Sequence, residues 1–193
     1  MNKMKLKSFI TIAMLSSISC ILMFLNFPLP YFPVFLEIDF SDVPALIAAI
    51  IMGPVAGIIV ELIKNILNWI FIGAPTGVPV GHIANFTTGL LFILPVYYLY
   101  KKSGSLKGLM MGLIAGTFTM AIGMSILNYV AFLPMYTYFL GMGGFDAKEM
   151  IVLGILPFNF IKGIMLMVLV MMLFRTMRRW IENQRAQYLL QKQ

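Results

Sequence analysis

Long stretches without a charged side chain dominate this sequence. No Asp, Glu, Lys or Arg occurs in residues 8–36, 65–100 or 108–145. A helix that crosses a bilayer needs roughly 20 mostly apolar residues, because about 30 Å of hydrocarbon is crossed at about 1.5 Å per residue. Each stretch exceeds that length, so the pattern predicts membrane-spanning helices joined by loops.

Prolines and glycines mark the ends of these helices. Three prolines within residues 28–33 exclude a helix there, and Gly53-Pro54 ends one helix and begins another. We expect Ser41 or Asp42 to cap the short second helix. The sequence predicts a single transmembrane domain over residues 1–193, with a long loop between the first two of its helices. There are six predicted helices, at about residues 8–26, 43–52, 54–72, 80–100, 105–133 and 150–178.

Composition supports an all-α integral membrane protein, a six-helix bundle in contact with the lipid bilayer. Charged residues make up 11% of the chain and hydrophobic residues 61%, whereas a soluble domain carries about 25% charged residues. The net charge of +7 does not indicate a nucleic-acid partner, because the basic residues flank apolar segments. The lysine-rich start could belong to a cleaved signal, but the apolar run continues to Phe27, which favours a retained first helix.

The distribution of charge predicts the orientation. Lysines and arginines gather in residues 3–7, 101–107 and 175–185, whereas acids gather in residues 37–42 and 146–149. Lys and Arg near helix ends remain cytoplasmic. Both termini are therefore expected in the cytoplasm, and the loop between helices 1 and 2 outside.

Polar residues inside the predicted spans are the functional candidates, since burying them in lipid is expensive. Glu61 and Lys64 lie three residues apart on one helix face, which favours a structural ion pair over a role in transport. Asn159 and Lys162 share a face in the last helix, and Asn128 lies at similar depth in the fifth. Lys162 has no acid at helical spacing, so its partner is Glu61, a carbonyl or a ligand. These side chains could form a polar pocket or only join neighbouring helices.

Several kinds of chemistry have no motif in the sequence. The single histidine, His82, lacks Cys or acid at ligand spacing, so no metal site is expected. No nucleotide-binding glycine loop, Ser/His nucleophile arrangement or H-E-x-x-H motif occurs. The chain is therefore not expected to be an enzyme, and energy for uphill transport would come from a partner or an ion gradient.

Six segments, in order along the chain, resemble the riboflavin-specific S components of energy-coupling factor (ECF) transporters. The matching segments are LNFPLPYFPVFLEIDFSDVP at residues 25–44, GPVAG at 53–57, ELIKN at 61–65, GVPVGHIANF at 77–86, SILNY at 125–129 and ILPFNFIKG at 155–163. The resemblance implies a high-affinity riboflavin-binding subunit in the bacterial cell membrane, with no cofactor and with riboflavin as the transported ligand. It also implies a transmembrane T component and two ATPase subunits as partners. The family's contact with the T component is an alanine pair, for which this chain has Ala13 and Ser17.

Flavin chemistry fits the matched segments. Asn side chains both donate and accept hydrogen bonds, which suits the polar edge of the ring, and Lys162 can only donate. Apolar walls flank most ligands, and glycine lets the backbone approach closely. The resemblance thus implies a set of substrate-binding residues drawn from the loop and three helices: Phe35, Leu36, Asp39, Gly81, Asn85, Asn128, Asn159 and Lys162.

Two other functions remain open from the residues alone. One is a stand-alone ion-coupled transporter with a proton relay through Glu61 and Lys162, which would work without an ATPase. The other is a membrane scaffold that packs through the glycines at 108, 112 and 116 and binds no small molecule.

Overall fold

The chain folds into a bundle of apolar helices. The computed structural model describes residues 3–74, 77–141, 144 and 146–190, so Pro75 and Thr76, between the third and fourth predicted helices, lie outside the described residues. Five helical segments in the described part are long and apolar enough to cross a membrane, and a sixth apolar helix is shorter. The helices are α1 (Lys3–Phe24), α2 (Asp42–Met52), α3 (Pro54–Ile72), α4 (Val80–Ser103), α5 (Leu106–Leu127), α6 (Leu133–Leu140), α7 (Ala147–Glu149) and α8 (Leu156–Leu190).

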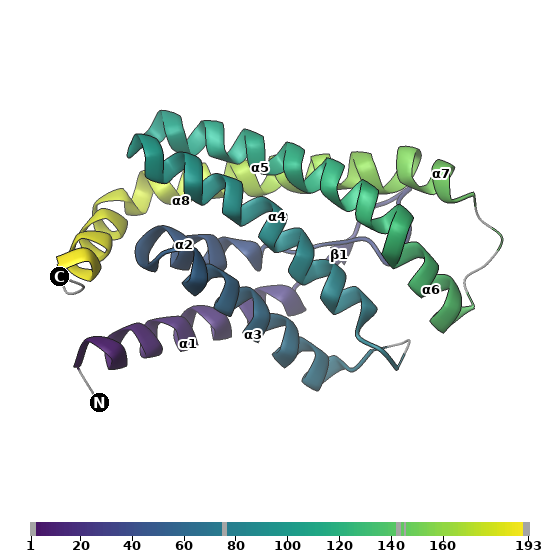
Figure 1. Ribbon diagram of the computed structural model, residues 1–193, viewed down its shortest axis with the longest axis horizontal. Helices are drawn as coiled ribbons and strands as arrows, with labels where there is room; N and C mark the ends of the chain where they lie inside the picture. The colour runs from purple at the N-terminus through teal and green to yellow at the C-terminus, as the bar shows by residue number, and fades with distance from the viewer. Residues whose placement is uncertain (1–2, 75–76, 142–143, 145, 191–193) are drawn as a thin grey trace.

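The short helix α2 lies in the middle of the bundle, against α1, α3, α4 and α8. Nine of its 11 residues are buried. On the other side, α5 packs between α4 and α8. The two termini lie at one end of the bundle, and β1, α6 and α7 lie at the other (Figure 1). Large apolar side chains such as Phe9, Ile114 and Val168 stay exposed on the outer surface, as lipid contact requires.

The predicted break between the second and third helices has a clear backbone cause. Gly53 adopts a φ of 100°, a conformation that favours glycine, and its N–H donates to the carbonyl of Ala49. Pro54 then begins α3, where its missing N–H is not needed. The start of α2 differs from the prediction. Ser41 occupies the N-cap position, but its side chain makes no capping hydrogen bond because the hydroxyl instead contacts Asp39 and Lys64.

The long loop before α2 contains two short strands that the sequence did not predict. β1 (Phe27–Pro28) pairs antiparallel with β2 (Glu37–Ile38). The prolines exclude helix here, as expected, and the small ladder closes the intervening residues into a compact flap. Ile38 is fully buried, so the ladder is anchored to the bundle.

Two π-helical segments interrupt the last long helices. The first, η1 (Asn128–Phe132), precedes Pro134, and the second, η2 (Met150–Ile155), precedes Pro157. A proline cannot donate to the carbonyl four residues earlier, and a local widening of the helix accommodates that loss. The fifth helix was predicted to end near residue 133, but the chain stays helical through η1 and α6 to Leu140.

Small residues bring α4 and α5 close together. A Cβ atom added at Gly112 would lie 2.9 Å from the carbonyl oxygen of Val96, and one at Gly116 would lie 2.7 Å from that of Phe92. The four-residue spacing of glycines thus forms a packing surface for α4. The last helix was predicted to end near residue 178, but α8 continues to Leu190. In this extension Ile181 packs into the bundle, while Arg178 and Glu182 form an ion pair on the exposed face.

Candidate ligand-binding pocket

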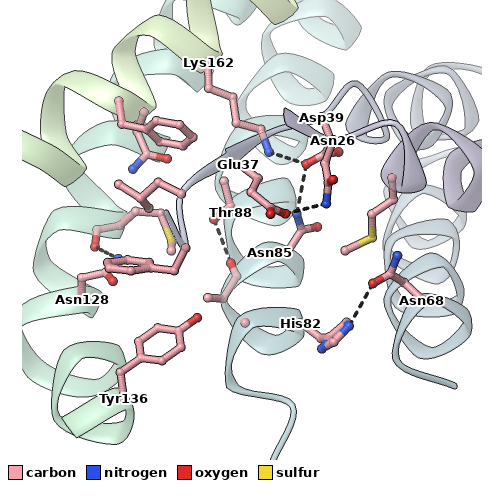
Figure 2. Close-up of a pocket in the computed structure, with 18 of the residues that line it drawn as sticks. Asn26, Glu37, Asp39, Asn68, His82, Asn85, Thr88, Asn128, Tyr136 and Lys162 are labelled. Atoms are coloured by element: carbon pink, nitrogen blue, oxygen red, sulfur yellow. Dashed lines mark hydrogen bonds and ion pairs between the residues drawn. The ribbon is translucent and has the colours of Figure 1, made fainter. Parts of the chain in front are cut away.

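A cavity of about 430 Å³ opens among the flap and helices α3, α4, α5 and α8, at the end of the bundle opposite the termini. Its volume is in the range that holds a small organic molecule. Its walls combine apolar side chains with amides, acids and one lysine (Figure 2). All eight predicted substrate-binding residues line this cavity: Phe35, Leu36, Asp39, Gly81, Asn85, Asn128, Asn159 and Lys162.

Two buried asparagines present hydrogen-bonding groups to the cavity from neighbouring helices. Asn128 begins η1, and Asn159 lies in the first turn of α8. The Nδ2 of each donates to the carbonyl four residues earlier, at 2.8 Å to Met124 and at 2.8 Å to Ile155. The side-chain oxygen of each amide, and its second hydrogen, have no partner in the described part of the chain. Each of these two asparagine side chains can therefore accept one further hydrogen bond and donate one more.

Aromatic rings form a wall beside these amides. The rings of Phe35, from the flap, and Tyr136, from α6, lie with their centroids 5.3 Å apart. Phe158 faces the flap from α8, where its ring packs against Phe32. Gly81 leaves room for this wall, because a Cβ there would lie 3.2 Å from the hydroxyl of Tyr136. Such a wall suits a flat aromatic ligand.

A buried cluster of five charged residues adjoins the cavity, and two of them, Asp39 and Lys162, line it. Lys162 Nζ lies 3.0 Å from Asp39 Oδ2 and 3.5 Å from Asp42 Oδ2. Lys64 Nζ lies 2.5 Å from Asp42 Oδ1 and 2.8 Å from Glu61 Oε2. All five side chains are at most 3% exposed. The cluster connects the flap and the start of α2 to α3 and α8.

The sequence left open whether Lys162 pairs with Glu61, a carbonyl or a ligand. The structure has the Glu61–Lys64 pair, but in the described part of the chain Lys162 forms ion pairs with Asp39 and Asp42 rather than with Glu61. Asp39 also accepts from Asn85 at 3.2 Å, so one carboxylate joins two of the cavity-lining groups (Figure 2). Lys162 is thereby held in position while it still lines the cavity.

The loop acids are perturbed in opposite directions. Burial alone would raise the pKa of Asp39, but the ammonium groups of Lys162 and Lys64 and hydrogen bonds from Ser41 and Lys162 hold it below its ordinary value. For Glu37, partial burial raises the pKa, the charge of Asp39 raises it further, and a hydrogen bond from Asn26 opposes both. Asp39 is therefore a carboxylate at neutral pH.

Sequence reasoning did not assign several cavity residues. Asn68 and His82 were given no binding role from the sequence, yet His82 Nε2 lies 3.0 Å from Asn68 Oδ1 at the cavity wall. Asn26, which directly precedes β1, donates a hydrogen bond of 2.5 Å to the carboxylate of Glu37 in β2. Tyr136 lies eight residues after Asn128, about two turns along the same helical path, and this spacing was an available signal.

The proposed partner contact lies elsewhere on the molecule. Ala13 and Ser17 are exposed on α1, where the hydroxyl of Ser17 donates to the carbonyl of Ala13 at 3.0 Å. Neither residue lines the cavity. Their contact with another protein stays a prediction.

Comparison with known proteins adds independent information. Residues 7–174 match the family described as ECF transporter, substrate-specific component. The chain is 52% identical over 189 residues to riboflavin transporter FmnP of Bacillus subtilis (strain 168), covering 96% of this chain and 100% of that one. It is 45% identical over 185 residues to riboflavin transporter RibU of Staphylococcus aureus (strain TCH60), covering 95% and 96%. A solved S component of a bacterial ECF transporter matches with a TM-score of 0.80 and 44% identity, over 92% of this chain and 98% of that chain.

Proposed function

Because this chain belongs to the family of substrate-specific components of ECF transporters, we propose that it is the riboflavin-binding subunit of an ATP-driven vitamin uptake system. The two relatives above are named riboflavin transporters. The chain is accordingly a multi-pass membrane transport protein and not an enzyme. Its location in the bacterial plasma membrane is part of the proposal.

One structural observation carries the choice of ligand: the cavity places an aromatic wall beside two amides and a lysine. The ring system of riboflavin has carbonyls, ring nitrogens and one N–H along one edge. Asn128 and Asn159 can both donate to and accept from such an edge, while Lys162 can donate to a carbonyl or ring nitrogen. Phe35 and Tyr136 can contact the faces of the ring.

The proposed orientation puts both termini in the cytoplasm and the cavity toward the outside. The two termini lie at one end of the bundle and α6 at the other (Figure 1), and the cavity is lined by Tyr136 of α6 and by Gly81 at the start of α4. The basic segments near the ends of α4 and α8 support a cytoplasmic position for the end with the termini. In this orientation the flap between α1 and α2 covers the cavity from outside.

Energy is proposed to come from other subunits. We infer association with a transmembrane T component and two ATPase subunits, with Ala13 and Ser17 on the exposed face of α1 in that contact. The stand-alone alternative used a relay between Glu61 and Lys162. Among the described residues Lys162 forms no direct ion pair with Glu61; it pairs with Asp39 and Asp42, and Glu61 pairs with Lys64.

The test is to purify the full chain in detergent from riboflavin-containing medium and to record its spectrum and a riboflavin titration. We expect co-purified flavin and tight binding without ATP. A colourless protein that does not bind added riboflavin would refute the proposal and favour a scaffold. In vesicles, accumulation should require the T component and the ATPases. Accumulation by this chain alone, driven by a proton gradient, would favour the stand-alone transporter.

A further inference from the structure

The cavity has a second polar end, which the ring-binding residues do not account for. Figure 2 shows Asn128 and Tyr136 on one side, Asn68 and His82 on the other, and Asn26 and Glu37 between them. If the flavin ring lies against the first side, the rest of the ligand must extend toward the second. In riboflavin that remainder is the ribityl chain, a flexible tail of hydroxyl groups.

The groups at this second end match a polyol. A hydroxyl donates one hydrogen bond and accepts up to two. Asn68 is 5% exposed, and its Nδ2 is buried without a hydrogen-bond partner among the described residues. Its Oδ1 is engaged with Nε2 of His82, which leaves the other ring nitrogen of His82 for a ligand. Asn68 thus supplies a donor that needs an acceptor, since an unmade buried hydrogen bond is expensive.

The charge at this end is negative. Glu37 lines the cavity and is held by the amide of Asn26, and the lysine of the cavity wall, Lys162, is already paired with Asp39 and Asp42. A carboxylate can accept hydrogen bonds from hydroxyl groups, but it repels a phosphate. Flavin mononucleotide differs from riboflavin only by a phosphate on the last hydroxyl of the tail.

We propose that Asn68, His82 and Glu37 bind the ribityl hydroxyls, and that the charge of Glu37 makes the site favour riboflavin over flavins with an anionic tail. This inference rests on the riboflavin-binding function proposed above. Glu37 is its selectivity residue and Asn68 its tail-binding residue. Because Glu37 is accessible to solvent, its effect on a phosphate is screened and is expected to be about three- to tenfold.

The experiment compares three ligands on the full chain in detergent: riboflavin, flavin mononucleotide and lumiflavin, which has the ring without the polyol. Glu37→Gln keeps an oxygen that can accept from Asn26, so the flap should stay closed. We expect it to raise the affinity for flavin mononucleotide relative to riboflavin by about three- to tenfold. The matched control is Glu149→Gln, which removes the same charge from an exposed residue of α7 outside the cavity wall, and it should leave the ratio unchanged.

Two further measurements make the test decisive. In the unmodified chain, raising the salt concentration to about 1 M should reduce the preference for riboflavin over flavin mononucleotide, because the repulsion is screened. Asn68→Ala should weaken riboflavin binding several-fold and leave lumiflavin binding unchanged.

An unchanged ratio in Glu37→Gln, or equal losses of riboflavin and lumiflavin in Asn68→Ala, would overturn this inference alone. Failure of the unmodified chain to bind any flavin would overturn the proposed function as well.

Discussion

Replacing Lys162 with methionine separates its two proposed tasks, ligand binding and compensation of buried acids. Among the described residues the substitution leaves Asp39 with no ammonium within ion-pair distance, because its ion pair is with Lys162, whereas Lys64 pairs with Asp42 and Glu61. Removing one member of a buried ion pair destabilises a protein by about 3–5 kcal/mol. We therefore expect a large fall in the melting temperature of Lys162→Met in detergent.

The double variant Asp39→Asn/Lys162→Met isolates the ligand contribution. Neutralising Asp39 removes the uncompensated charge, so the double variant should recover much of the lost stability. A hydrogen bond from a charged donor contributes about 1.5–3 kcal/mol, and each 1.4 kcal/mol is about tenfold in affinity. Relative to Asp39→Asn alone, the double variant should bind riboflavin about ten- to a hundredfold more weakly.

The assays are thermal unfolding and titration of riboflavin fluorescence on the same samples. Equal riboflavin affinity of the double variant and Asp39→Asn would show that Lys162 only compensates acids, and would refute its assignment to the ligand. A double variant no more stable than Lys162→Met would instead refute the pairing with Asp39.

Three other outcomes are expected. Asn128→Ala and Asn159→Ala should each weaken riboflavin binding by about 0.5–1.5 kcal/mol, roughly two- to tenfold, in the same titration; affinities equal to that of the unmodified chain would contradict their assignment. A cysteine at Ser103 should react with an impermeant thiol reagent only from the cytoplasm and one at Asp146 only from outside, and the reverse labelling would invert the proposed orientation. The pKa of Asp39 is lowered in the folded state, so its stabilising contribution is complete above its ordinary value of 3.8 and is lost as the pH falls below that value. As the pH is lowered below about 3.8, melting temperatures should therefore fall more steeply for the unmodified chain than for Asp39→Asn, and parallel curves there would contradict this.

The class of the protein was accessible from the sequence because it depends on local properties, and the candidate residues were accessible mainly through the family resemblance. A lipid-spanning helix needs a long apolar run, and the Gly53-Pro54 pair interrupts a helix through its own backbone preferences. The i,i+3 spacing of Asn159 and Lys162 also puts them on one face of any helix. The matched segments directed attention to eight residues that the structure does bring to one cavity.

Packing between elements decided what local pattern could not. Lys162 pairs with Asp39, 123 positions away, and no periodicity connects a loop acid to a lysine in the last helix. The polar end at Asn68 and His82 exists only because α3 and α4 lie side by side there. Sequence spacing fixes which side chains share a helix face, but the identity of the facing helix is a property of the folded bundle.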